Sequence, residues 1–275
     1  MTLSTIRNNP AKQKKVKTKK QKAIAATCAV AFWLLVWHVV SLCVGSELVL
    51  VSPVKVVQTL FTVIFDPDFL KTVWYSAARI LGGFFTALTF GTVLGWVASR
   101  FWVVETLLRP ITAVIKATPV ASFIILVLLW FSGKNLSVII SMLMVFPVIY
   151  MNVLEGIRSA DEKLLEMAQV FRLSVGKKLL YIYLPAVAPF FVSACSVSLG
   201  LCWKSGIAAE VIGTPDGSIG AVFYQAKIFL QTSELLAWTV VVVAVSVAFE
   251  KLFMLLLRLV LKKLKMEDVL NGKRA

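Results

Sequence analysis

Side chains that carry out covalent chemistry are scarce in this sequence. Among 275 residues there are one histidine and four cysteines, and no two cysteines have Cys-x-x-Cys spacing. Neither a disulfide framework nor a metal site is therefore indicated. We expect Cys28, Cys43, Cys195 and Cys202 to be small, buried apolar residues, and His38, inside a long apolar run, to have a packing role.

Three common catalytic signatures are also missing. The sequence has no G-x-x-x-x-G-K-S/T loop, no G-x-S-x-G elbow and no H-E-x-x-H pair. A chain without the phosphate-binding loop is not expected to bind or hydrolyse ATP. We therefore predict no catalytic residue, no metal and no cofactor of its own, and any energy must come from a partner.

Acidic residues are few, and charged residues of either sign are uncommon. Asp and Glu number 14 against 29 Lys and Arg, which gives a net charge of +15. Charged residues make up 16% of the chain and hydrophobic residues 59%, with a mean hydropathy of +0.86. Soluble globular domains do not have this balance. The composition predicts an all-α integral membrane protein.

Six segments are apolar enough to cross a membrane as helices, a crossing of about 30 Å that needs roughly 20 residues. The predicted spans are residues 23–44, 74–99, 104–131, 137–153, 184–206 and 235–261. The third is interrupted by Arg109, Pro110, Lys116 and Pro119. We expect its first part to lie along the inner interface of the membrane and the crossing to begin near Thr118.

Lysine and arginine are distributed unevenly over the segments that connect these spans. Residues 1–22 carry eight of them, and the polar segment 155–185 and the tail 262–275 are also basic. Because cytoplasmic segments are enriched in Lys and Arg, both termini and segment 155–185 are predicted to be cytoplasmic. Basic residues that flank apolar spans account for the net charge, so no nucleic-acid partner is predicted.

The chain is predicted to comprise a basic arm (1–22), a transmembrane domain (23–261) and a basic tail (262–275). The arm is almost free of apolar residues, so we expect it to be disordered and to lie on anionic lipid, worth ~1 kcal/mol per lysine. Alternatively, residues 12–43 could form a cleaved signal that leaves five spans. An apolar run of more than twenty residues argues against that reading.

Three shorter features are predicted to be structural. Gly91 and Gly95 allow close helix approach, either within the chain or, as the alternative, in a dimer contact. Residues 54–64 have the pattern of a short amphipathic helix on the outer surface, and 221–230 that of another short helix. Glu250 and Lys251 are neighbours, so we expect them to contact other helices rather than each other.

The polar segment 155–185 reads as a helix–turn–helix between two spans. Ser159 and Glu162 have capping-box spacing, which predicts a helix start at Ser159. An apolar stripe of helical spacing follows, formed by Leu164, Ala168, Phe171 and Val175. Residues 172–176 break this helix, and residues 177–183 are predicted to form a second one.

This segment resembles the EAA loop of ABC importer permeases. Glu166-Met167-Ala168 stands where that loop reads E-A-A, and Leu184-Pro185 closes it in the same way. Arg172 occupies the position of the family's glycine. If the turn requires positive φ there, arginine costs roughly 1 kcal/mol.

The resemblance extends over residues 52–256 and points to the nitrate/sulfonate/taurine type of permease. The similar stretches are 76–84, Leu108-Arg109-Pro110, Thr118-Pro119, Leu129-Trp130-Phe131 and 208–213. It implies six transmembrane helices of the type I importer fold in a bacterial plasma membrane. Implied partners are two ATPase subunits, a second and identical permease chain, and an extracytoplasmic solute-binding protein.

The resemblance also implies which residues act. Those expected to couple the chain to the ATPase are Glu166, Met167, Ala168, Phe171, Arg172, Gly176, Leu184 and Pro185. Ionisable and polar residues inside spans suggest a translocation pathway, namely Lys116, Thr118, Lys204, Ser205 and Glu210. Glu210 and Lys204 could pair across a helix break near Gly206. The structural alternative is that the lysines snorkel and that Glu210 is an internal hydrogen-bond anchor.

Two other classes of function stay open at this point. A secondary transporter or channel would need mid-span carboxylates for ion coupling and internal repeats, and neither is clear. A membrane-embedded enzyme would need a catalytic set that the chain lacks. The transported solute is left open among nitrate, sulfonates, taurine and vitamin precursors.

Overall fold

The described part of the chain is entirely helical. The computed structural model describes residues 19–264, apart from the side chains of residues 19–23 and 26, and this part contains no strand. Five helices are long and apolar enough to cross a membrane, or six spans if one bent pair of helices counts as a single span. The prediction of an all-α membrane protein is thereby confirmed, and the predicted number of six spans holds when the bent pair is taken as one span. The basic arm and tail lie largely outside the described residues.

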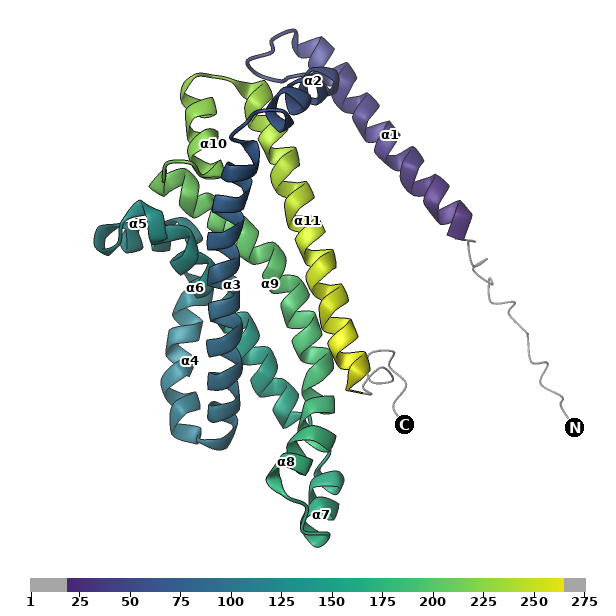
Figure 1. The fold of residues 1–275 in the computed structure, drawn as a ribbon, viewed down its shortest axis with the longest axis vertical. Coiled ribbons are helices and arrows are strands. Elements are labelled where there is room, and N and C mark those ends of the chain that lie inside the picture. The colour runs from purple at the N-terminus through teal and green to yellow at the C-terminus, as the bar shows by residue number, and fades with distance from the viewer. Residues whose placement is uncertain (1–18, 265–275) are drawn as a thin grey trace, which may run out of the picture. The chain divides into compact units, whose positions relative to one another are not determined.

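The chain divides into two units, residues 1–55 and 56–275. The first unit contains α1 (Lys19–Val44), coloured purple in Figure 1, and ends inside α2 (Pro53–Ile64). α1 is apolar on all sides and has no single buried face. Cys28 and Cys43 on α1 are exposed, so the expectation that all four cysteines are buried holds only for Cys195 and Cys202.

Three long helices form the centre of the second unit. They are α3 (Phe69–Arg100), α6 (Gly133–Arg158) and α9 (Leu184–Gly213), which lie side by side in Figure 1. Their shared core includes Ile80, Phe84, Ile149, Leu199 and Trp203, all at most 2% exposed. α6 is the most enclosed of the three, because 56% of its most apolar stretch is buried.

α3 and α6 approach closely through glycines on one face of α3. A Cβ on Gly83 would lie 2.4 Å from the carbonyl oxygen of Val138, and one on Gly91 would lie 3.0 Å from Ile149. A Cβ on Gly95 would lie 3.0 Å from the carbonyl oxygen of Tyr150. The predicted glycine contact therefore lies within the chain, since α6 already occupies this face of α3.

The third predicted span is divided into two helices that point in different directions. α4 (Trp102–Ala117) and α5 (Val120–Trp130) meet at Thr118-Pro119 with a bend of 110°. α4 runs lengthwise beside α3 and also contacts α6 (Figure 1). The expectation that this first part lies along the membrane interface is wrong, because α4 is aligned with the long helices and α5 is the part that turns across them.

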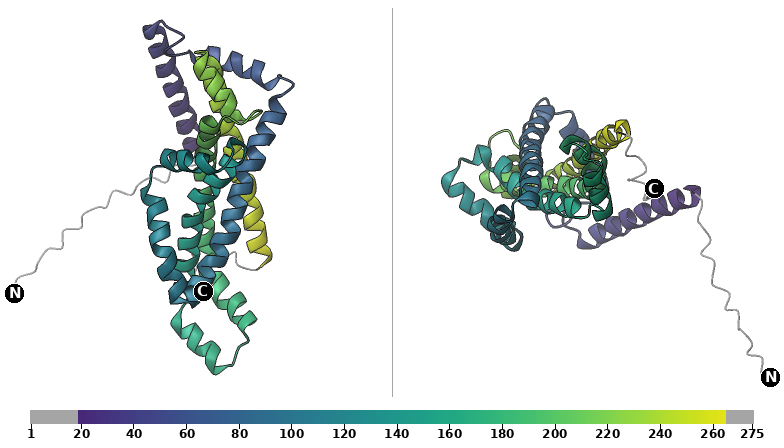
Figure 2. Two further views of the ribbon diagram at one scale, coloured as in Figure 1. Left: turned by 90° about the vertical axis from the view of Figure 1, so that its left-hand side faces the viewer. Right: turned by 90° about the horizontal axis from the view of Figure 1, so that it is seen from below.

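Two further elements complete the second unit. α10 (Ile219–Ile228) packs on α9, and α11 (Thr232–Lys263) runs beside α9 with few buried residues. The polar segment between α6 and α9 projects from the opposite end to α10, as both Figure 1 and the left view of Figure 2 show. The predicted short helices at 54–64 and 221–230 correspond to α2 and α10.

Candidate functional site

The polar loop, defined as residues 159–183, begins with a helix whose cap differs from the predicted one. α7 (Glu162–Val170) is capped by Asp161, whose carboxylate accepts a hydrogen bond from the Lys163 N–H at 2.9 Å. Ser159 instead follows α6, and its hydroxyl donates to the carbonyl oxygen of Gly156 at 2.8 Å. The predicted helix start at Ser159 is therefore wrong, because α6 uses this serine to finish its own last turn.

α7 ends in a turn at Arg172, a residue whose side chain disfavours the backbone conformation found there. Arg172 has φ of +48°, the left-handed conformation that glycine adopts most readily. The Arg172 N–H donates to Gln169 at 3.0 Å and the Leu173 N–H donates to Ala168 at 2.9 Å, the paired hydrogen bonds of a Schellman motif. The turn therefore lies at Arg172. This residue has the positive φ at which arginine costs roughly 1 kcal/mol relative to glycine.

Only one residue of the predicted apolar stripe is buried against the rest of the loop. Ala168 is 0% exposed and packs in a small cluster with Ala160 and Ile182. The other three members of the stripe, Leu164, Phe171 and Val175, are exposed. The reason is that α7 is short and its buried side continues through Leu165 instead.

α7, the residue that follows it and the start of α8 (Val175–Lys178) consequently present uncovered apolar side chains. We call this the loop face, and it consists of Leu164, Met167, Val170, Phe171 and Val175. Val170 and Val175 are each 79% exposed and Phe171 is 71% exposed. Glu166 is also exposed and takes part in no ion pair among the described residues. A water-exposed apolar patch of this kind beside charged groups is typical of a protein-docking surface.

The second half of the loop leads into the next long helix without interruption. α8 (Val175–Lys178) contains the exposed Gly176 and continues through the π-helical turn η1 (Leu179–Tyr183) into α9. Leu184 and Pro185 form the first turn of α9, and Leu184 packs near Ala188 and Leu261. A displacement of the loop would therefore be passed directly to α9.

A second polar cluster lies at the other end of the bundle, around Glu210. Glu210 is 0% exposed, and its Oε2 accepts a hydrogen bond from Ser76 Oγ at 2.6 Å and one from the Gly220 N–H at 3.4 Å. Ser76 Oγ in turn accepts from the Ile219 N–H at 2.9 Å. Glu210 on α9 and Ser76 on α3 thus accept hydrogen bonds from the first N–H groups of α10, which have no partner within that helix.

This cluster rules out one predicted contact. α9 runs without a break through Gly206, and Lys204 is exposed and outside any ion pair of the described part. The predicted pairing of Glu210 with Lys204 is therefore wrong. Its premise was a helix break at Gly206, but that glycine serves close packing, since a Cβ there would lie 2.5 Å from Ile80.

The other predicted pathway residues are dispersed rather than gathered. Ser205 is buried and donates to the carbonyl oxygen of Leu201 on its own helix at 2.9 Å. Thr118 donates to the carbonyl oxygen of Val114 at 2.8 Å, at the break between α4 and α5. Lys116 is exposed, with Nζ 3.5 Å from Sδ of Met151 on α6.

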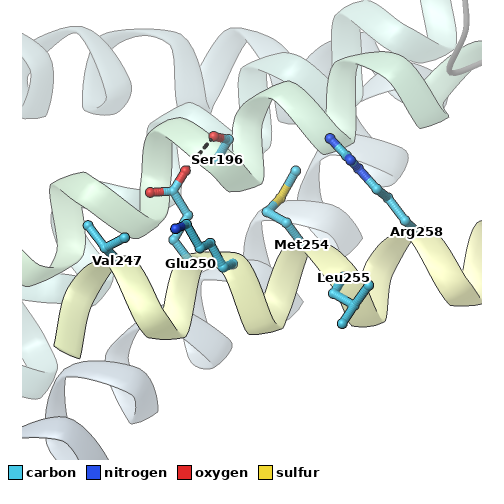
Figure 3. Close-up of a pocket in the computed structure, with 7 residues that line it drawn as sticks. Ser196, Val247, Glu250, Met254, Leu255 and Arg258 are labelled. Carbon is cyan, nitrogen blue, oxygen red and sulfur yellow. Dashed lines mark hydrogen bonds between the residues drawn. The ribbon is translucent and has the colours of Figure 1, made fainter. Parts of the chain in front are cut away.

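A hollow between α9 and α11 contains the carboxylate of Glu250. The Oε1 of Glu250 accepts a hydrogen bond from Ser196 Oγ at 3.0 Å, as the dashed line in Figure 3 shows. Lys251 and Arg258 also line this cavity of about 500 Å³. The expectation that Glu250 contacts another helix rather than its neighbour is confirmed by this bond.

Sequence reasoning overlooked the polar side of α4. Glu105, Arg109, Thr112 and Lys116 follow one another at spacings of four, three and four, which places them on one helical face. Glu105 forms an ion pair with Arg158 at the end of α6. The spacing was visible in the sequence, but Arg109 and Lys116 were read as interruptions of an apolar span and Lys116 as a pathway candidate, without reference to Glu105 and Thr112.

Long apolar helices, one of them bent, with a polar loop between two spans are the features of a multi-pass membrane protein. Residues 87–266 match the family model described as binding-protein-dependent transport system inner membrane component. Because this match covers more than half of the chain, the protein belongs to that family. It is thus a permease subunit of ABC importers, located in the plasma membrane, and the family's members are not themselves enzymes.

Several curated proteins are similar over most of their length. The putative aliphatic sulfonates transport permease SsuC of Bacillus subtilis is 29% identical, with 83% of each chain covered. The taurine transport permease TauC of Escherichia coli is 27% identical over 78% of this chain and 80% of its own. The nitrate import permease NrtB of Synechocystis is 25% identical over 74% and 76%. The predicted nitrate/sulfonate/taurine type is confirmed.

The fold is also found among solved structures. A crystal structure of an amino acid ABC transporter with histidines matches with a TM-score of 0.50 and 16% identity, covering 70% of this chain and 96% of that one. At this identity the likeness concerns the fold alone.

Proposed function

We propose that the chain forms the solute pathway of an ATP-driven importer together with a second, identical permease chain, and that two ATPase subunits grip it at the polar loop. The observation that carries this proposal is the loop face, an exposed apolar surface around Glu166 at the end of the bundle. Covering such a surface with a partner stabilises the complex by about 25 cal/mol per Å² of apolar area removed from water.

The structure of the loop supports a mechanical role. Ala168 ties α7 to the remainder of the loop, and η1 continues into α9 without a flexible linker. When ATP binding draws the two ATPase subunits together, α7 moves with them and α9 transmits the displacement to the spans. The pathway then opens outward to accept solute from an extracytoplasmic binding protein, and hydrolysis resets it. ATP is bound only by the partner subunits.

The orientation that this function needs agrees with the charge pattern. The loop and both termini lie in the cytoplasm, where an ATPase has access to Glu166. The transported solute is a small molecule of the kinds that the relatives' names give: aliphatic sulfonates, taurine and nitrate. Lys116, Thr118, Lys204, Ser205 and Glu210 are retained as pathway candidates, with Ser205 and Glu210 acting through the packing described above.

A charge reversal at Glu166 tests the coupling. Glu166→Lys leaves the fold intact because the side chain is exposed and forms no ion pair with the residues that the structure describes, but it places a cation where the ATPase docks. We expect the assembled transporter to lose ATP-driven uptake in vesicles by about tenfold or more while it stays in the membrane, a change of about 1.4 kcal/mol in coupling.

The matched control is Glu47→Lys, the same charge reversal at an exposed glutamate outside the loop. Uptake by this variant should equal that of the unchanged protein. Normal ATP-driven uptake by Glu166→Lys, or uptake that persists when the ATPase is removed, would contradict the proposed function.

A further inference from the structure

Charged side chains lie along the face of α11 that borders α9. The residues of this face follow the three- and four-residue spacing of one helical face. They line the cavity of about 500 Å³ together with Ser196 of α9, and they are Val247, Glu250, Lys251, Met254, Leu255 and Arg258. Figure 3 shows the side chains of Glu250, Met254 and Arg258 directed from α11 toward α9. The cavity is therefore a charged space between two membrane helices.

The exposed surface of α11 around this cavity is apolar. Only 6% of the most apolar stretch of α11 is buried, and its leucines next to the cavity are all more than half exposed, namely Leu252, Leu255, Leu256 and Leu259. Such a surface suits hydrocarbon chains and not a solute in water. A ligand that fits this place has both an apolar part and a charged part.

The cavity lies in the half of α11 that is nearer to the polar loop (Figure 1). The 32 residues of α11 extend for about 48 Å at about 1.5 Å per residue, against about 30 Å of hydrocarbon. Arg258 stands about 7.5 Å before the end of this helix at Lys263. Its guanidinium is therefore at the level of the lipid headgroups on that side of the membrane.

The two cations of the cavity outnumber its one carboxylate, which leaves a net charge of +1. Lys251 and Arg258 take part in no ion pair of the described residues, and the carboxylate of Glu250 accepts its hydrogen bond from Ser196. Glu250 is also about 12 Å from Arg258 along the helix axis, so it does not oppose an anion bound there. An uncompensated charge at membrane depth is costly, and an anion of one negative charge removes that cost.

We propose that this cavity binds one anionic phospholipid from the leaflet beside the polar loop. The guanidinium of Arg258 holds the phosphate, because its donors match the geometry that phosphate accepts. Lys251 lies about 10 Å deeper and extends its flexible side chain toward the same headgroup. The acyl chains lie along the apolar surface of α11 at Leu252 and Leu255. This inference goes beyond the proposed function, which assigns no site to a lipid.

Two lipids that differ only in the headgroup test this site. The purified full chain in detergent is titrated with phosphatidylglycerol or with phosphatidylcholine of the same acyl chains, and the bound lipid is counted by native mass spectrometry. We expect one phosphatidylglycerol to bind about tenfold more tightly than phosphatidylcholine, because a hydrogen bond to a charged group contributes enough for such a factor. Inorganic phosphate, which lacks acyl chains, should not displace it.

The variants assign the roles of the two cations. Arg258→Gln should reduce the affinity for phosphatidylglycerol to about that for phosphatidylcholine, and Lys251→Gln should weaken it several-fold. Lys263→Gln is the matched control, because it removes the same charge from an exposed residue of the same helix that does not line the cavity. This variant should bind phosphatidylglycerol as the unchanged chain does.

Three results would overturn the proposal. The two lipids could bind equally, Arg258→Gln could bind phosphatidylglycerol with unchanged affinity, or Lys263→Gln could lose as much affinity as Arg258→Gln, which would mean that only the general charge of the helix end matters. Displacement of the lipid by inorganic phosphate would equally exclude a lipid site. The assay contains no ATPase, so a failure of the coupling proposal would appear in the Glu166→Lys uptake experiment and not here.

Discussion

Arg172 shows how one residue can adopt a conformation that its side chain disfavours. Its φ of +48° belongs to the left-handed region, and the two hydrogen bonds of the Schellman motif hold it there. A residue with a Cβ loses roughly 1 kcal/mol relative to glycine in that region. The loop thus accepts a local strain in return for a defined end to α7.

Replacing this arginine tests the size of the strain. Arg172→Gly should stabilise the closed turn by about 1 kcal/mol, because glycine adopts positive φ without a clash. Hydrogen exchange at the Leu173 amide, which donates to Ala168, should slow by about fivefold.

Ser174→Gly provides the opposite control two residues further on. Ser174 has an extended conformation with φ of −62°, so glycine there gains nothing in the folded loop and adds freedom to the unfolded one. Exchange at Leu173 should stay the same or become faster. Slower exchange in both variants would show that the strain at Arg172 is not the cause.

At the scale of elements, the contact between α3 and α6 depends on which glycine faces the neighbour. Gly82 and Gly83 are adjacent in sequence, yet only Gly83 approaches α6, at 2.4 Å between its virtual Cβ and the Val138 carbonyl oxygen. Gly82 has no atom within 4 Å of such a Cβ. The two glycines therefore make a matched pair.

Alanine at these two positions should act in opposite directions. Gly83→Ala forces α3 and α6 apart at a backbone atom that cannot yield, so we expect a loss of about 1–3 kcal/mol. Gly82→Ala should be neutral or stabilising by up to about 1 kcal/mol, because alanine has the better helix propensity.

Thermal unfolding of the two purified variants in the same detergent compares them directly. A lower midpoint for Gly83→Ala alone supports the close approach of the helices. Equal midpoints for both variants would mean that α6 does not lie against Gly83 as described.

At the scale of the whole molecule, the orientation of the chain determines whether a cytoplasmic ATPase can reach the polar loop. The excess of Lys and Arg in the loop and in both terminal segments predicts that all three are cytoplasmic. A single cysteine at position 166, in a chain whose four natural cysteines are replaced by serine, should react with a membrane-impermeant maleimide in inside-out vesicles and not in intact cells.

A cysteine at position 47 is the natural comparison, because Glu47 lies in the turn after the first span. It should react from outside the cell. Labelling of position 166 in intact cells would place the loop on the wrong side for the proposed coupling.

Much of this protein could be predicted from the sequence alone, because a membrane restricts the possibilities. Backbone groups in hydrocarbon must be paired within the segment, so long apolar runs had to become helices. The spans, the short helices α2 and α10 and the turn at Arg172 follow from apolar length, periodicity and local residue chemistry. The likeness of the loop to a known family pointed to the transport role.

Only the tertiary structure decided which side chains meet. The carboxylate of Glu210 was noticed, but Ser76 lies 134 positions away and nothing local links them. Asp161 rather than Ser159 caps α7, because the Ser159 hydroxyl is hydrogen-bonded to Gly156 at the end of α6. The polar face of α4 contacts α6 through the ion pair of Glu105 with Arg158, and nothing in the local sequence links these two residues. Periodicity fixes the face on which a residue lies, whereas the partner of that face depends on how separate helices pack.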